Sequence, residues 1–134
     1  MTSKVVYLGE LRTECTHLRS GHTYITDAPT DNHGKGEAFS PTDTVATGLA
    51  NCMLTAMDIK ARDLGVELAG SVAEVTKHMA ASPRRISQIE VDLHLPSGVG
   101  EKHRKILENT GRTCPVAMSL HPEIEQVIRF QWTR

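Results

Sequence analysis

The stretch SPTDTVATGLANCMLTAMDIKARDLG, residues 40–65, has the features of one long helix with a cysteine at its middle. Ser40 is a suitable N-cap, Pro41 suits the first helical position, and the acid Asp43 follows three residues after the cap. Gly65 is placed to end the helix at the C′ position. The signals at both ends therefore predict a single helix across the stretch.

Apolar residues inside this stretch recur at helical spacing. The expected core-facing stripe is Val45, Leu49, Cys52, Ala56 and Ile59. Three more apolar side chains widen it: Met53, Leu54 and Met57. A helix that is apolar on most sides is buried rather than laid on a surface. Cys52 is thus expected on a core helix, where a cysteine without further context is a small packing residue.

Length and charge narrow the class of protein. A chain of 134 residues indicates a single domain, residues 1–134, with enough chain for a sizeable core. The formal net charge of −1 gives no reason to expect nucleic acid or an anionic membrane as a partner. No apolar run reaches the roughly 20 residues of a membrane span. The first ten residues lack the pattern of a secretory signal, so we expect a cytoplasmic protein.

The three cysteines are expected to serve thiol chemistry or core packing rather than a disulfide scaffold. No paired Cys or His spacing resembles a zinc site, so no metal is expected. Cys114 has the better local setting for a reactive thiol. We expect Thr113 to cap a short helix through Leu120, which places Cys114 in the first turn, where N–H groups and the helix dipole favour a thiolate. Cys15 is expected to be structural.

The rest of the chain alternates strand-like and helical segments. Strands are expected at residues 4–8, 11–18 and 22–27, before a loop at 28–39. After the long helix, a hairpin is expected from residues 66–80 and 84–96, then helices at 99–110 and 113–120, and a last strand at 124–132. The order βββ-α-ββ-α-α-β, with strands in antiparallel groups, predicts an α+β fold. A helix too apolar for so few strands to cover also suggests an intimate dimer.

Two stretches, FSPTDTVATGLANCMLTAMD at 39–58 and TCPVAMSLHPEIE at 113–125, are similar to the OsmC/Ohr family of osmotically induced and organic-hydroperoxide-resistance proteins. The opening SGHTYITDAP also fits, and the chain looks closer to the small OsmC-like branch. The resemblance implies an intertwined homodimer with antiparallel sheets around a buried central helix and sites between subunits. It also implies thiol-dependent reduction of organic hydroperoxides in stress defence, without a metal or organic cofactor.

Carried over by position, Cys52 resembles the peroxidatic cysteine and Cys114 the resolving one. The first thiolate attacks the peroxide and becomes a sulfenic acid, and the second thiol converts it to a disulfide. An external dithiol, such as a lipoyl protein or thioredoxin, then reduces the disulfide. The family's arginine, which holds the thiolate and polarises the peroxide, best matches Arg12, with Arg19 second.

The chain departs from the family at the start of the long helix. The family's peroxidases carry a glutamate directly after the helix-starting proline, where it fixes the arginine, but here that residue is Thr42. The acid comes one residue later, at Asp43, which is about 100° further around the helix. Asp43 either replaces the glutamate or caps the helix, and the S-x-x-D pattern accounts for it fully as a cap.

Two functions outside peroxidase turnover stay open. One is a binding protein that holds a small apolar or thiol-reactive ligand, which the residue at Thr42 favours. The other is a redox sensor that uses the same cysteine pair. Hydrogen peroxide is a second candidate substrate beside organic hydroperoxides. The methionines Met53, Met57 and Met118 are expected in the core or around an apolar pocket.

Overall fold

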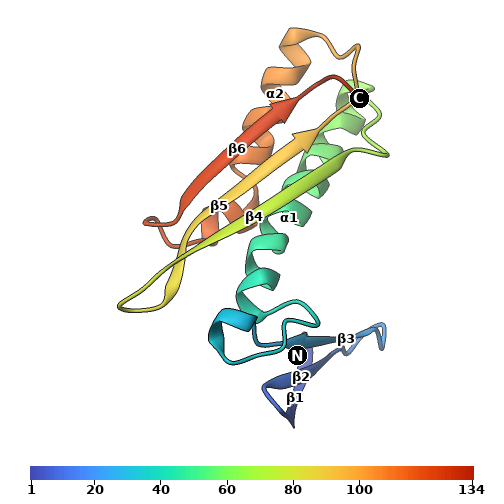
Figure 1. Ribbon diagram of the computed structural model, residues 1–134. Helices are drawn as coiled ribbons and strands as arrows, with labels where there is room; N and C mark the ends of the chain where they lie inside the picture. The colour runs from blue at the N-terminus through green and yellow to red at the C-terminus, as the bar shows by residue number, and fades with distance from the viewer. The chain divides into compact units, whose positions relative to one another are not determined.

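The computed structural model describes residues 1–134, and the order of its helices and strands agrees with the predicted order (Figure 1). The strands are β1 (Ser3–Gly9), β2 (Arg12–His17), β3 (Thr23–Asp27), β4 (Val72–Ala80), β5 (Arg85–His94) and β6 (Glu125–Gln131). The helices are η1 (Thr30–Asn32), a 3₁₀ turn, α1 (Pro41–Leu64), α2 (Glu101–Arg112) and α3 (Pro115–Ser119). The predicted α+β class is confirmed. By their internal contacts the residues form two compact units, Met1–Val45 and Ala46–Arg134.

The N-terminal unit is built on an antiparallel sheet of order β1-β2-β3. Glu10 and Leu11 make the turn between the first two strands, with φ values of 56° and 62°. Positive φ at both central residues is the pattern of a type I′ hairpin turn. Leu11 therefore belongs to the turn, and β2 begins at Arg12 rather than at residue 11. The β2–β3 register then places Arg12 opposite Asp27.

The predicted ends of α1 are confirmed. The Asp43 N–H donates to Ser40 Oγ at 3.0 Å, and the Ser40 N–H donates to Asp43 Oδ2 at 3.0 Å, which is a reciprocal capping box. At the other end Gly65 has φ 68°, and the Val66 N–H donates to the Ala61 carbonyl at 3.0 Å. This is the Schellman arrangement, which satisfies a carbonyl that the helix leaves open.

The buried face of α1 differs from the predicted stripe. Its buried residues are Ala46, Leu49, Ala50, Met53, Met57 and Ala61. Val45 and Ile59, which were predicted to face the core, are 42% and 65% exposed. The prediction was wrong here because α1 is apolar on two sides, and packing selects the side that carries the methionines. No helix of the chain is both long enough and apolar enough to cross a membrane.

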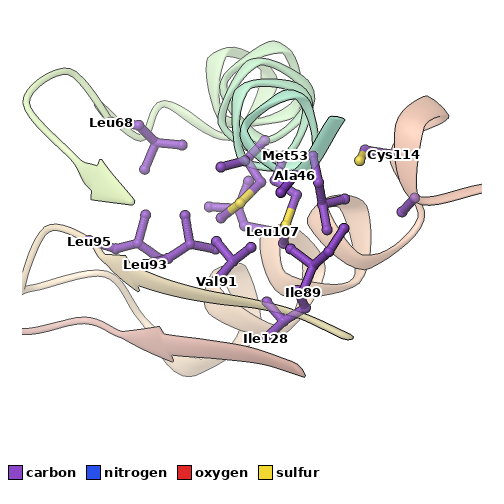
Figure 2. Packing of buried hydrophobic residues seen from close by; sticks show 14 of the residues in the cluster. Ala46, Met53, Leu68, Ile89, Val91, Leu93, Leu95, Leu107, Cys114 and Ile128 are labelled. Carbon is purple, nitrogen blue, oxygen red and sulfur yellow. The ribbon is translucent and has the colours of Figure 1, made fainter. Parts of the chain in front are cut away.

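The C-terminal unit holds a sheet of order β4-β5-β6 with α1 and α2 on one face (Figure 1). The predicted β4–β5 hairpin is confirmed, but β6 runs parallel to β5. The expectation of antiparallel groups was therefore wrong for this pair. The connection through α2 and α3 returns the chain to the end of the sheet where β5 begins, so β6 runs in the same direction as β5. Figure 2 shows the buried side chains of Ile89, Val91 and Leu93 in the layer between this sheet and the helices.

The opposite face of the same sheet is polar. Glu90 accepts bonds from His78 at 2.5 Å and from Arg129 at 2.7 Å, and Arg129 also binds Asp92 at 2.8 Å. The His78 hydrogen bond, followed by the charge of Arg129, lowers the pKa of Glu90. The strict alternation along β5 therefore separates an aliphatic layer from an ion-paired one.

Helix α2 approaches α1 closely at Gly111. A Cβ placed on Gly111 would lie 3.0 Å from Met57 Sδ and 3.3 Å from Met53 Cε. Both methionine side chains are fully buried. The contact therefore needs a residue without a side chain, or a neighbour that can yield slightly.

We predict that Gly111→Val lowers the free energy of unfolding by about 1–3 kcal/mol, because the added methyl groups overpack this contact. Gly111→Ala is the matched control. Its single methyl meets the flexible ends of methionines and gains helix propensity, so its effect should stay within about 1 kcal/mol. Urea unfolding monitored by circular dichroism measures both. Equal stability of the two variants would contradict the close contact.

Candidate active site

Helix α1 carries Cys52 to the N-terminus of α3. Cys52 is half-buried, and its Sγ accepts the backbone N–H of Val116 at 3.5 Å. This contact joins residues that lie 64 positions apart in the chain. The contact places a backbone N–H of the α3 N-terminus against the Cys52 sulfur.

Cys114 is itself the N-cap of α3, with φ −63° and ψ 158°, and Pro115 occupies the first turn. The predicted cap, Thr113, instead ends α2, where its N–H and its Oγ1 both donate to the Asn109 carbonyl. The predicted placement of Cys114 inside the first turn was therefore wrong by one residue. The reason is that α2 extends to Arg112, two residues beyond its predicted end.

Burial raises the pKa of the Cys114 thiol, since only 1% of the residue is exposed. The neighbouring Cys52 thiol raises it further, through a hydrogen bond and through charge, while the N–H groups of Ala117 and Val116 act in the opposite direction. The expectation of a thiolate at Cys114 was thus wrong in direction, because desolvation outweighs the helix N-terminus. The two thiols are direct neighbours with different surroundings.

Two contacts hold the segment around Cys114 in place. Gln126 of β6 donates its side-chain amide to the Ala117 carbonyl at 3.1 Å. Cys114 also belongs to the buried cluster, and Figure 2 shows it at the margin of that cluster. The second thiol is therefore fixed by the core rather than by a mobile loop.

Arg12 lies in the N-terminal unit and binds two carboxylates. Its Nη2 donates to Asp27 Oδ2 at 3.3 Å and to Glu37 Oε1 at 2.6 Å. Asp27 is buried and also accepts the Glu37 N–H at 3.0 Å. That N–H bond, followed by the charge of Arg12, lowers the pKa of Asp27 against the opposing effect of burial.

Asp43 and Thr42 lie in the first turn of α1. Asp43 forms the capping box with Ser40, and Thr42 Oγ1 lies 3.3 Å from Ser40 Oγ. The carboxylates bound to Arg12 are those of Asp27 and Glu37. Arg19, the second candidate arginine, is exposed after the end of β2.

Sequence reasoning missed Asp27 and Glu37. Asp27 could have been found, because the β2–β3 hairpin makes it the cross-strand neighbour of Arg12, and opposite charges favour that position. Glu37 gave no such signal, since it lies in the loop between η1 and α1, whose course no periodicity predicts.

The structure also describes the third cysteine and the methionines that were expected in the core. Cys15 is buried in β2 opposite Tyr24, and their hydrogen bond raises the pKa of Tyr24. Met118 is 67% exposed on α3, so its expected place in the core was wrong, while Met53 and Met57 are buried as expected. Nowhere do three or more His, Cys, Asp or Glu side chains converge as metal ligands.

Comparison with known proteins yields one family and several solved structures. A sequence model described as OsmC-like protein matches residues 34–128. A Psychrobacter arcticus 273-4 protein, named for a proposed osmotic-stress-induced and detoxification response, shares 55% identity over 97% of this chain and 95% of its own, with a TM-score of 0.93. None of the curated proteins matches.

Two more distant structures share the fold. The organic hydroperoxide resistance protein OsmC of Legionella pneumophila is 15% identical over 98% of this chain and 97% of its own, with a TM-score of 0.76. OhrB of Bacillus subtilis, an organic hydroperoxide resistance protein, is 16% identical over 98% of both chains, with a TM-score of 0.72.

We predict that iodoacetamide labels Cys52 faster than Cys114 in the folded protein near neutral pH. Cys114 is buried and its raised pKa keeps it protonated, so its labelling should increase only as the solution is made alkaline. Peptide mapping by mass spectrometry measures both sites, with the buried Cys15 as internal reference and urea-unfolded protein as control. Labelling of Cys114 at or above the rate of Cys52 at neutral pH would contradict the burial of Cys114 and the raised pKa of its thiol.

Proposed function

Because the chain belongs to the OsmC-like family, we propose that it is a thiol-dependent peroxidase that reduces organic hydroperoxides in oxidative and osmotic stress defence. The observation that carries the proposal is that the two thiols are neighbours, together with the Val116 N–H bonded to Cys52. The names of the solved relatives, which include hydroperoxide resistance proteins, support the choice of substrate.

Burial supports the division of roles between the thiols. Cys52 is half-buried and receives an N–H bond, which suits the nucleophile that meets the peroxide. Its thiolate attacks the outer peroxide oxygen, the O–O bond breaks, and the alkoxide leaves as an alcohol after taking a proton. Cys52 then carries a sulfenic acid.

The buried Cys114 suits the resolving step, because a protonated thiol next to Cys52 is protected from the peroxide. The Cys114 sulfur attacks the sulfenic sulfur, its proton joins the departing hydroxide as water, and a disulfide forms. A dithiol of the lipoyl or thioredoxin type reduces the disulfide to two thiols and is itself oxidised.

Arg12 is the cation in this proposal. A guanidinium can stabilise the thiolate and the alkoxide that develops as the O–O bond breaks. Asp43 serves the site through the helix, since its capping box fixes the first turn of the element that carries Cys52. No metal or organic cofactor enters any of these steps.

The proposed assembly is a homodimer with its sites at the subunit interface. The uncovered side of α1 holds Val45, Cys52 and Ile59, and a Cβ on Gly48 would meet no atom within 4 Å. Strand β1 also exposes apolar side chains: Val5, Val6, Tyr7 and Leu8. Apolar surface of this extent is typical of a partner interface, and a second copy of the chain is the partner that the family resemblance implies.

We predict that the reduced protein turns over cumene hydroperoxide with dithiothreitol or dihydrolipoamide, and that Cys52→Ser abolishes turnover because the nucleophile is lost. Without a donor, Cys114→Ser should consume one equivalent of peroxide and keep Cys52 as a sulfenic acid, because no second thiol converts it to a disulfide. Cys15→Ala is the matched control and should keep wild-type turnover. Loss of peroxide is followed by a ferrous oxidation assay. The absence of turnover in folded, reduced wild type with either donor would exclude the proposal.

A further inference from the structure

Arg12 is held by carboxylates that do not come from helix α1. We propose that Asp27 and Glu37, the acidic clamp, are positioning residues that hold Arg12 by one nitrogen and leave its other N–H groups for the hydroperoxide. The inference deepens the proposed function and rests on the role that this function gives to Arg12. Its basis is the geometry of the N-terminal unit alone.

Asp27 is the fixed half of the clamp. Its side chain is fully buried, and Oδ2 accepts both Arg12 Nη2 and the Glu37 N–H, while Oδ1 has no hydrogen-bond partner. The buried charge is therefore compensated through one oxygen, and Arg12 is the only cation bound to it. A buried carboxylate that loses its partner is strongly disfavoured, so Asp27 and Arg12 constrain each other.

Glu37 is the second half, and the loop before α1 delivers it. The Gly36 N–H donates to the Ala28 carbonyl at 3.1 Å, and the Asp27 N–H donates to the Phe39 carbonyl at 3.0 Å, which closes the base of the loop. A Cβ on Gly34 would lie 1.7 Å from the Ala28 carbonyl oxygen, so this course of the loop requires glycine there. The backbone thus brings Glu37 to Arg12.

Both carboxylates bind the same nitrogen of Arg12, Nη2. A guanidinium has five N–H donors in a rigid planar fork, and Nη2 supplies two of them. Fixing Nη2 at two oxygens fixes the plane of the whole fork. Nη1 and Nε are bound to neither carboxylate, and on a side chain that is 34% exposed the N–H groups of Nη1 suit a single oxygen acceptor.

The acidic clamp also accounts for the residue at Thr42. The family resemblance implies a glutamate at this position that fixes the arginine. With Asp27 opposite Arg12 across the β2–β3 ladder and Glu37 at 2.6 Å, the arginine is fixed without it. Asp43 is then left to cap α1.

The test uses full-length protein with isotope-labelled arginine. The Arg12 signal is identified as the arginine resonance that is missing from the spectrum of Arg12→Lys. Nuclear magnetic resonance measures rotation of the Arg12 guanidinium in wild type, Asp27→Asn, Glu37→Gln and Glu10→Gln. Glu10 is an exposed carboxylate two residues from Arg12, and Glu10→Gln is the control for charge alone. Glu37 is 59% exposed, so Glu37→Gln keeps the test valid if Asp27→Asn does not fold.

We expect slow rotation in wild type and in Glu10→Gln, and faster rotation in both clamp variants. For cumene hydroperoxide, kcat/KM should fall about tenfold in Glu37→Gln, the effect of losing one charge-assisted hydrogen bond, and Glu37→Asp should recover part of it. Unchanged rotation in both clamp variants overturns the clamp. Faster rotation with unchanged kcat/KM overturns the positioning role. Faster rotation in a protein whose wild type lacks turnover supports the clamp and rejects the peroxidase function instead.

Discussion

The contact of Met53 and Met57 with Gly111 limits how closely α1 and α2 approach each other in the C-terminal unit. Helix α1 carries Cys52, and α2 leads within two residues of its end to Cys114. Because both methionines are fully buried and a Cβ at position 111 would already lie 3.0 Å from Met57 Sδ, the helices have little room to approach each other further. The thiol pair therefore depends on core packing rather than on a flexible loop.

The two sulfurs share a neighbour and differ in solvation. The Val116 N–H bonds to Cys52 and also counteracts the raised pKa of Cys114. Cys114 is desolvated in the margin of the core, whereas Cys52 keeps an open side. Desolvation raises the pKa of the Cys114 thiol, so burial disfavours a thiolate at that member of the pair. A half-buried thiol beside a buried one is the asymmetry that the proposed two-cysteine peroxidase needs.

Local signals predicted the ends of α1 and the alternation along β5, since a capping box, a C′ glycine and a two-residue period each act within a few residues. The buried side of α1 was not predictable, because both sides are apolar and only the fold chooses between them. The parallel pairing of β6 with β5 was not predictable for the same reason, because the fold and not the local sequence decides it. The two carboxylates bound to Arg12 differ in this respect. Asp27 could have been paired with Arg12 by counting along the β2–β3 hairpin, whereas Glu37 reaches Arg12 only through a folded loop.

The most direct test of the central claim, that Cys52 and Cys114 act as one redox pair, is the mass of the protein after one equivalent of cumene hydroperoxide. The reduced protein is treated without a donor, quenched in acid and digested without reduction. The account predicts the loss of two hydrogen atoms and a peptide that joins Cys52 to Cys114. Oxygen added to Cys52 with Cys114 still a free thiol, or a disulfide that involves Cys15, would contradict it.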